Sequence, residues 1–215
     1  MEPRKAPPEH YSLDIFADAS SVRDVLKGVL NLIFFHRFFP SVRPVAIDVL
    51  DLTLPAINDV NLETLIDSRV SALVRQYLSS SSPGGSAGTT TAYDSGGGGG
   101  SGVRGRIAVE FYEKRRRRSS GIWFSGLAGK AEEEVCWEVW TLDVTIATPR
   151  TESERAKVRK AMEHMLQKAA LKILAVVNRD KDHIPPITTS DSNPFPYRIV
   201  LNPRSDSWQN RLGLH

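Results

Sequence analysis

Cys136 is the residue whose type most directly suggests covalent chemistry, because a lone cysteine with histidines elsewhere in the chain can form a nucleophile–base pair. It lies between Val135 and Trp137, in a stretch with the composition of a strand. A reactive cysteine needs an electropositive and accessible setting, whereas a cysteine among apolar strand residues packs as a small hydrophobe. We therefore expect Cys136 to be a packing residue, and a cysteine enzyme is only a remote alternative.

The histidines do not have the spacing of metal ligands. His10, His36, His164 and His183 are scattered along the chain, and one cysteine is too few for a zinc site built from four cysteines or from two cysteines and two histidines. The stretch GGSAGTTT lacks the lysine of a phosphate-binding loop. We expect no catalytic residues, no metal and no cofactor, and hence a protein that is not an enzyme. A single cysteine also fits a reducing compartment such as the cytosol.

The positive charge is concentrated in one short run. Lys114, Arg115, Arg116, Arg117 and Arg118 supply five positive charges, and since the whole chain has a formal net charge of +3, the rest of it is slightly acidic. A nucleic-acid-binding domain spreads its basic residues over a helix or a face. Such a run is most often solvated; the alternatives are contact with an acidic protein, phospholipid head groups or nucleic acid.

Ile122, Trp123 and Phe124 form an apolar group that serine and glycine flank on both sides, in SSGIWFSG. Either this loop folds back and buries both rings, or the rings stay exposed for a partner's pocket. Burial of a Phe-sized side chain is worth about 1.5–3 kcal/mol, so two exposed rings need a reason. Aromatic anchors dominate interface hot spots, and we favour partner binding.

Periodicity predicts the elements that position these residues. Helical spacing of apolar residues predicts helices over 20–39, 61–78 and 151–179. Strands are expected over 10–18, 45–57, 106–114, 135–147 and 196–201. We interpret 45–57 as one strand covered on both faces. Capping boxes are expected where Ser21 precedes Asp24 and where Thr151 precedes Glu154.

Residues 106–114 and 135–147 are expected to pair antiparallel, which makes 115–134 a long hairpin loop that carries the aromatic group. On the second of these strands, Trp137 and Val139 alternate with Trp140 and Leu142 and are expected on the opposite face. The order of elements predicts an α+β fold in which about three helices pack on a mainly antiparallel sheet.

The chain is long enough for a single domain with a real core. We expect a disordered stretch over 1–9, one domain over 10–202 and a tail over 203–215. Within the domain, 79–102 is rich in serine and glycine and reads as a flexible loop, either natural or an engineered insertion. No apolar run is long enough to span a membrane.

The residues EFYEKRRR, WFSG and EVCWEVWTLDVTI strongly resemble the central hairpin of the autophagy-related protein 101 family of HORMA-domain proteins, in a fungal-type form. The FFHR at 34–37 and the long helix after TESER also lie where that family has them. The resemblance is most specific over 104–147 and extends loosely over 10–201. The long 79–102 segment and the end after Leu201 depart from the family pattern.

The resemblance implies a HORMA domain held in an open state and a non-catalytic scaffold of the autophagy-initiating kinase complex, located in the cytoplasm and at the phagophore assembly site. It implies a heterodimer with the HORMA domain of autophagy-related protein 13, for which His36 and Arg37 are the candidate contact. Trp123 and Phe124, with Ile122, correspond to the WF finger that recruits downstream autophagy factors.

The alternative function is a phospholipid- or nucleic-acid-binding domain that uses the run from Lys114 to Arg118 as its contact. An acidic membrane surface is the more natural target of that run, and nucleic acid is not the expected partner.

Overall fold

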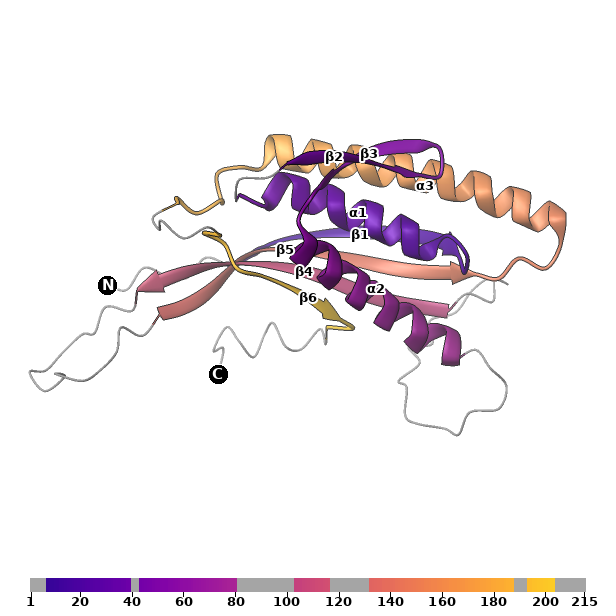
Figure 1. Cartoon of the computed structure of the whole chain (residues 1–215), viewed down its shortest axis with the longest axis horizontal. Helices are drawn as coiled ribbons and strands as arrows, with labels where there is room; N and C mark the ends of the chain where they lie inside the picture. The colour runs from indigo at the N-terminus through magenta and orange to yellow at the C-terminus, as the bar shows by residue number, and fades with distance from the viewer. Residues whose placement is uncertain (1–6, 40–42, 81–102, 117–131, 188–192, 204–215) are drawn as a thin grey trace, which may run out of the picture.

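The computed structural model describes residues 7–39, 43–80, 103–116, 132–187 and 193–203, which form three helices and six strands (Figure 1). In chain order these are β1 (Glu9–Asp18), α1 (Val22–Arg37), β2 (Pro44–Val49), β3 (Leu52–Ile57), α2 (Val60–Ser80), β4 (Val103–Arg116), β5 (Glu132–Ala147), α3 (Glu152–Arg179) and β6 (Tyr197–Leu201). Among them, no helix has the length and apolarity needed to cross a bilayer.

The main sheet has the strand order β1-β5-β4-β6. β4 pairs antiparallel with both β5 and β6, and β1 pairs parallel with β5. A parallel pair needs a crossover rather than a hairpin, and the chain between β1 and β5 contains α1, the strands β2 and β3, α2 and β4. The predicted α+β class, the mainly antiparallel sheet and the pairing of β4 with β5 are confirmed.

All three helices bury apolar residues in one core on the same side of the main sheet. The sheet contributes Ile107, Val109, Leu142 and Val144 to that core, where they lie together with residues of α1, α2 and α3. The alternation of apolar and polar residues along the strands predicted this face. In Figure 1, α3 and α1 run along the sheet, and α2 lies near the edge that β6 forms.

The prediction of one strand over residues 45–57 is wrong, because these residues form the hairpin of β2 and β3. Val49 pairs with Leu52, so Leu50 and Asp51 make a two-residue turn, and Leu50 has a φ of 57°. Turns of this length require positive φ and usually use glycine or asparagine. A leucine gives no such signal. Most of β2 is also exposed or half-buried rather than covered on both faces.

Of the two predicted capping boxes, the one at Thr151 and Glu154 is confirmed at the start of α3. The one at Ser21 is wrong, because its side chain accepts no capping bond. The carboxylate of Asp18 instead accepts hydrogen bonds from the backbone N–H of Ser20 at 3.0 Å and of Ser21 at 2.8 Å. Burial acts to raise the pKa of Asp18, but these hydrogen bonds outweigh it and lower that pKa.

The predicted face of Trp137 is also wrong, because a β-bulge interrupts the strand. The register of β4 against β5 shifts between Phe111, opposite Glu138, and Tyr112, opposite Cys136, which leaves Trp137 without a directly opposed residue. A bulge places two residues of one strand against one of the other and redirects a side chain. The ring of Trp137 consequently lies 5.7 Å from that of Phe111 and joins the core.

Candidate interaction sites

β4 and β5 extend beyond the rest of the main sheet as a two-stranded ribbon. β5 pairs with β1 only from Glu138 onward, and β4 pairs with β6 only up to Phe111. The pairs from Tyr112 opposite Cys136 to Arg116 opposite Glu132 therefore lie beyond the ladders with β1 and β6, although the backbone N–H of Tyr112 still donates to the Pro196 carbonyl at 2.8 Å. Figure 1 shows these strand ends reaching past the helices. We call the segment formed by 112–116 and 132–136 the ribbon; the chain between its strands is residues 117–131.

The basic run lies opposite an acidic run on this ribbon. The opposed pairs are Lys114 with Glu134, Arg115 with Glu133, and Arg116 with Glu132. Opposite charges directly across an antiparallel pair stabilise it by about 0.2–1 kcal/mol each. Lys114 and Arg115 thus lie opposite carboxylates of the protein itself, and Arg115 also forms an ion pair with Glu113. The sequence signal for this arrangement is two runs of opposite sign flanking one hairpin loop.

The base of the ribbon is attached to β6 by further contacts. Arg198 forms an ion pair with Glu134 at 2.5 Å, and its guanidinium carbon lies 4.6 Å from the ring centroid of Tyr112. The hydroxyl of Tyr112 donates a hydrogen bond to Glu110. Burial, together with this bond, raises the pKa of Tyr112 to about 12, so the phenol remains a donor at neutral pH.

The aromatic group expected to form the finger, Ile122, Trp123 and Phe124, lies outside the described residues, as do Arg117 and Arg118. Most of the serine- and glycine-rich stretch, residues 81–102, lies outside them too. What the structure does establish is where the two strands that lead into 117–131 end, and how they are paired.

A buried ion pair joins the end of α1 to the middle of β5. Arg37 Nε donates to both carboxylate oxygens of Glu138 at 2.9 Å. The same carboxylate accepts a hydrogen bond from Trp140 Nε1 at 2.5 Å and lies 2.6 Å from His183 Nε2. A buried charge is tolerated only when it is paired and hydrogen-bonded, and Glu138 meets both conditions.

The same cluster holds the chain that follows α3. Arg37 Nη2 donates to the backbone carbonyl of Asp180 at 3.2 Å, and the hydroxyl of Tyr11 donates to the Asp180 carboxylate at 3.1 Å. A hydrogen bond from Arg179, together with that from Tyr11, lowers the pKa of Asp180 to about 2. Burial and the neighbouring Asp180 raise the pKa of Tyr11 well above its ordinary value. The segment after α3 is therefore attached to α1, β1 and β5.

The structure separates the two residues expected to contact a HORMA partner. Arg37 is 3% exposed and its guanidinium is used inside the protein. His36 is half-buried, and its Nε2 has no hydrogen-bond partner among the described residues. Burial and the adjacent Arg37 charge lower the pKa of His36. Contact of His36 and Arg37 with a HORMA partner stays a prediction. Because its side chain is buried, Arg37 would contribute by holding the end of α1 in place.

Cys136 and possible metal ligands are the other sites that the sequence analysis considered. Cys136 is half-buried, and its thiol donates to the backbone carbonyl of Glu138 at 3.6 Å, a structural environment. In the part of the chain that the structure describes, no group of three or more His, Cys, Asp and Glu side chains is arranged to hold a metal ion.

The exposed side of α3 carries two apolar residues that the helical periodicity of the sequence does not identify. Leu171 is 60% exposed and Leu174 is 36% exposed. Residues three apart lie next to each other on a helix surface, so the two leucines form one small apolar patch. Their signal was weak because both fall outside the stripe that faces the core.

Comparison with known proteins gives a consistent family. The family model of autophagy-related protein 101 matches residues 14–191. Autophagy-related protein 101 of Arabidopsis thaliana is 22% identical over 214 residues, which cover 90% of this chain and 86% of the relative. That of Schizosaccharomyces pombe is 26% identical over 190 residues, covering 88% and 84%. That of Homo sapiens is 30% identical over 108 residues, or 44% of each chain.

The match spans the elements from β1 to the chain after α3, and the observed three helices on a mainly antiparallel sheet agree with a HORMA-like α+β domain. The family is named for autophagy and not for a catalytic activity. The chain belongs to the autophagy-related protein 101 family.

Proposed function

We propose that this chain is a non-catalytic adaptor of the autophagy-initiating kinase complex, acting in the cytoplasm and at the phagophore assembly site. It pairs with and stabilises the HORMA domain of autophagy-related protein 13, and it recruits downstream autophagy factors through Trp123 and Phe124. The observation that carries the proposal is the ribbon, since β4 and β5 continue past both neighbouring strands and lead into the segment with these two aromatic residues.

The ribbon supports a recruiting role for physical reasons. A strand pair that leaves the sheet loses the packing of its neighbours, and an isolated two-stranded hairpin is only marginally stable in water. This chain compensates with charges opposed across the strands and with Arg198 on Glu134. The ribbon is useful if the segment that it leads into must reach a separate molecule. Ile122, which precedes Trp123 and Phe124 in the sequence, adds apolar area for a partner's pocket.

The pairing surface is the second part of the proposal. His36 is its expected contact, and Arg37 holds the end of α1 in place from within the buried cluster. Leu171 and Leu174 add exposed apolar area on α3, whose C-terminal end meets Arg37 through Asp180. The adaptor thus has two surfaces, and each can be removed without the other.

The test replaces each surface separately and measures two kinds of binding. Trp123→Ala with Phe124→Ala should leave co-purification with the partner HORMA domain intact and abolish recruitment of downstream factors. Leu171→Asp with Leu174→Asp should do the reverse. Val60→Ala serves as the control, because Val60 is an apolar residue that is 73% exposed at the start of α2 and belongs to neither surface. A loss of several kcal/mol of stability in the Trp123/Phe124 variant would show that the rings are core and contradict the finger.

The competing function is phospholipid or nucleic-acid binding through Lys114, Arg115, Arg116, Arg117 and Arg118. Its support is weakened because the first three of these residues lie opposite Glu132–Glu134. Replacing Arg115–Arg118 with serine and measuring binding to phosphatidylserine liposomes and to an oligonucleotide across salt concentrations separates the two functions. Charge-driven binding should fall steeply with salt and with these substitutions; recruitment through the rings should change little.

A further inference from the structure

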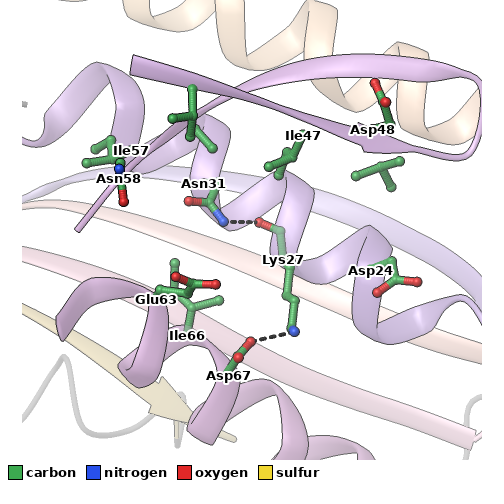
Figure 2. A pocket seen from close by; sticks show the side chains of 13 residues that line it. Asp24, Lys27, Asn31, Ile47, Asp48, Ile57, Asn58, Glu63, Ile66 and Asp67 are labelled. Atoms are coloured by element: carbon green, nitrogen blue, oxygen red, sulfur yellow. Dashed lines mark hydrogen bonds and ion pairs between the residues drawn. The ribbon is translucent and has the colours of Figure 1, made fainter. Parts of the chain in front are cut away.

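A groove of about 350 Å³ lies between the β2–β3 hairpin and α2, with α1 behind it (Figure 2). Ile47 of the hairpin and Ile66 of α2 line it from opposite sides, and Ile57 closes one end. It contains no residue of the ribbon, of the buried Arg37 cluster or of the leucine patch on α3. The proposed adaptor function therefore leaves this groove unused.

The apolar wall of the groove becomes more exposed along one strand. Val45, Ile47 and Val49 share one face of β2, and Val49 is 4% exposed whereas Val45 is 40% exposed. Val49 sits close to α1 because Gly28 has no side chain there: a Cβ on Gly28 would lie 2.8 Å from Val49 Cγ2. The strand is thus packed on α1 at its turn and stands away from the helices at its start, where apolar side chains remain uncovered.

The rim of the groove is acidic. Asp24, Asp48, Glu63 and Asp67 line it, and Lys27 is the one cation among the lining residues. Lys27 already forms an ion pair with Asp67 at 2.6 Å. Asp24 and Glu63 lie in the first turns of α1 and α2, where carboxylates stabilise the helix dipole. That role explains their presence at these positions but not the uncovered apolar side chains between them.

We propose that this groove binds a basic peptide segment of a partner protein, one with an apolar side chain between positively charged residues. The apolar residue would fill the space between Ile47, Ile57 and Ile66. The flanking cations would meet Asp24 and Glu63, which form no ion pair with the other described residues. Charge complementarity selects this occupant, because four carboxylates against one lysine disfavour an acidic or purely apolar segment.

The test uses three synthetic peptides of about twelve residues on the full chain. The first is an amphipathic lysine–leucine peptide, the second has glutamate in place of lysine, and the third has serine in place of leucine. Isotope-labelled isoleucine δ1 methyl groups report binding by NMR. Only the first peptide should shift the methyl signals of Ile47, Ile57 and Ile66. The methyl of Ile173, which is fully buried in α3, should not move and reports an intact fold.

Variants then test whether the rim is responsible. Asp24→Asn with Glu63→Gln should weaken binding of the lysine–leucine peptide by about threefold to tenfold, because exposed ion pairs contribute modestly. Asp14→Asn with Glu152→Gln removes the same charge from exposed positions that do not line the groove and should leave the affinity unchanged. Neither pair of substitutions touches a residue assigned to the adaptor surfaces, so partner pairing and recruitment should persist in both variants.

Three results would overturn the proposal. The first is a lysine–leucine peptide that leaves the three methyl signals in place, and the second is equal affinity for the Asp24/Glu63 variant and the wild-type chain. The third is movement of the same signals on raising the protein concentration with no peptide present, which would assign the groove to a second copy of this chain. If the chain neither pairs nor recruits but the lysine–leucine peptide still shifts these methyl signals, the proposed function is contradicted and the groove proposal stands.

Discussion

Arg37 and Glu138 are 101 residues apart in the chain and form an ion pair at 2.9 Å in which neither side chain is more than 2% exposed. Removing two charges from water is unfavourable, and their attraction compensates only when the remaining hydrogen-bonding capacity is also used. Here Trp140 and His183 bind the same carboxylate. The pair therefore determines how the end of α1, the middle of β5 and the chain after α3 meet.

Substituting one member of this pair should be strongly destabilising. Arg37→Met leaves Glu138 as a buried charge without its cation, and we expect a loss of about 3–5 kcal/mol in the free energy of unfolding. Arg37→Met combined with Glu138→Gln should lose less than the single variant, because no unpaired charge remains. Urea unfolding followed by circular dichroism measures both. Arg159→Met, which removes an ion pair of a 61% exposed arginine with Glu163, should lose less than about 1 kcal/mol.

If Arg37→Met costs no more than Arg159→Met, the buried pair is not a structural determinant, and the expected contact of Arg37 with a partner regains support.

The elements that periodicity predicts are those whose information is local. The stripe of α3 and its capping box at Thr151 are read from consecutive residues, and both are observed. The strand pair β4–β5 follows from two alternating segments around one loop. By contrast, the partner of Arg37 could not be read from the sequence, since nothing near Arg37 specifies that its cation will be buried opposite Glu138.

The predictions for residues 45–57 and for the face of Trp137 were wrong because a single residue changes the direction of the backbone at each place. Leu50 adopts positive φ and turns one apparent strand into a hairpin, although its residue type argues against this. Trp137 occupies a bulge that reverses its expected face, and a bulge leaves no mark in an alternating pattern. The acidic run at Glu132–Glu134 was visible, but its pairing with the basic run depends on the register, which the bulge shifts.

Reversing the acidic side of the ribbon should loosen it. Glu133→Lys with Glu134→Lys places like charges across from Lys114 and Arg115, and each such pair is destabilising by about 0.2–1 kcal/mol. We expect amide hydrogen exchange over 114–116 to accelerate by about threefold to tenfold. Adding Lys114→Glu with Arg115→Glu restores opposite charges across the strands and should restore part of the protection, since the ion pairs of Glu134 with Arg198 and of Arg115 with Glu113 stay lost.

The effect of that reversal should diminish at high salt, because exposed charges are screened. Unchanged exchange in the Glu133/Glu134 variant, at any salt concentration, would mean that the ribbon does not depend on its opposed charges.

Gly28 should be intolerant of a side chain. Gly28→Ala improves the helix propensity of α1 by about 1 kcal/mol, but the new Cβ would lie 2.8 Å from Val49 Cγ2 and 3.2 Å from Leu54 Cδ1. Overpacking typically costs about 1–3 kcal/mol, so we expect a net loss of about 1 kcal/mol in thermal or urea unfolding. Gly28→Ala with Val49→Ala removes the clash, and the two substitutions should be less than additive. A single variant more stable than the wild type would contradict close packing of the hairpin on α1.

His36 should make the protein less stable in mild acid. Burial and the Arg37 charge lower its pKa in the folded state, whereas the unfolded chain binds a proton near its ordinary pKa of about 6.5. Below that pH the unfolded state holds more protons, so stability is greatest above about 6.5 and falls with the pH. The loss in urea midpoint between pH 7.5 and 5.5 should be smaller in His36→Gln than in the wild type. His164→Gln, which changes an exposed histidine on α3, should behave as the wild type does; equal losses in all three proteins would show that His36 does not contribute.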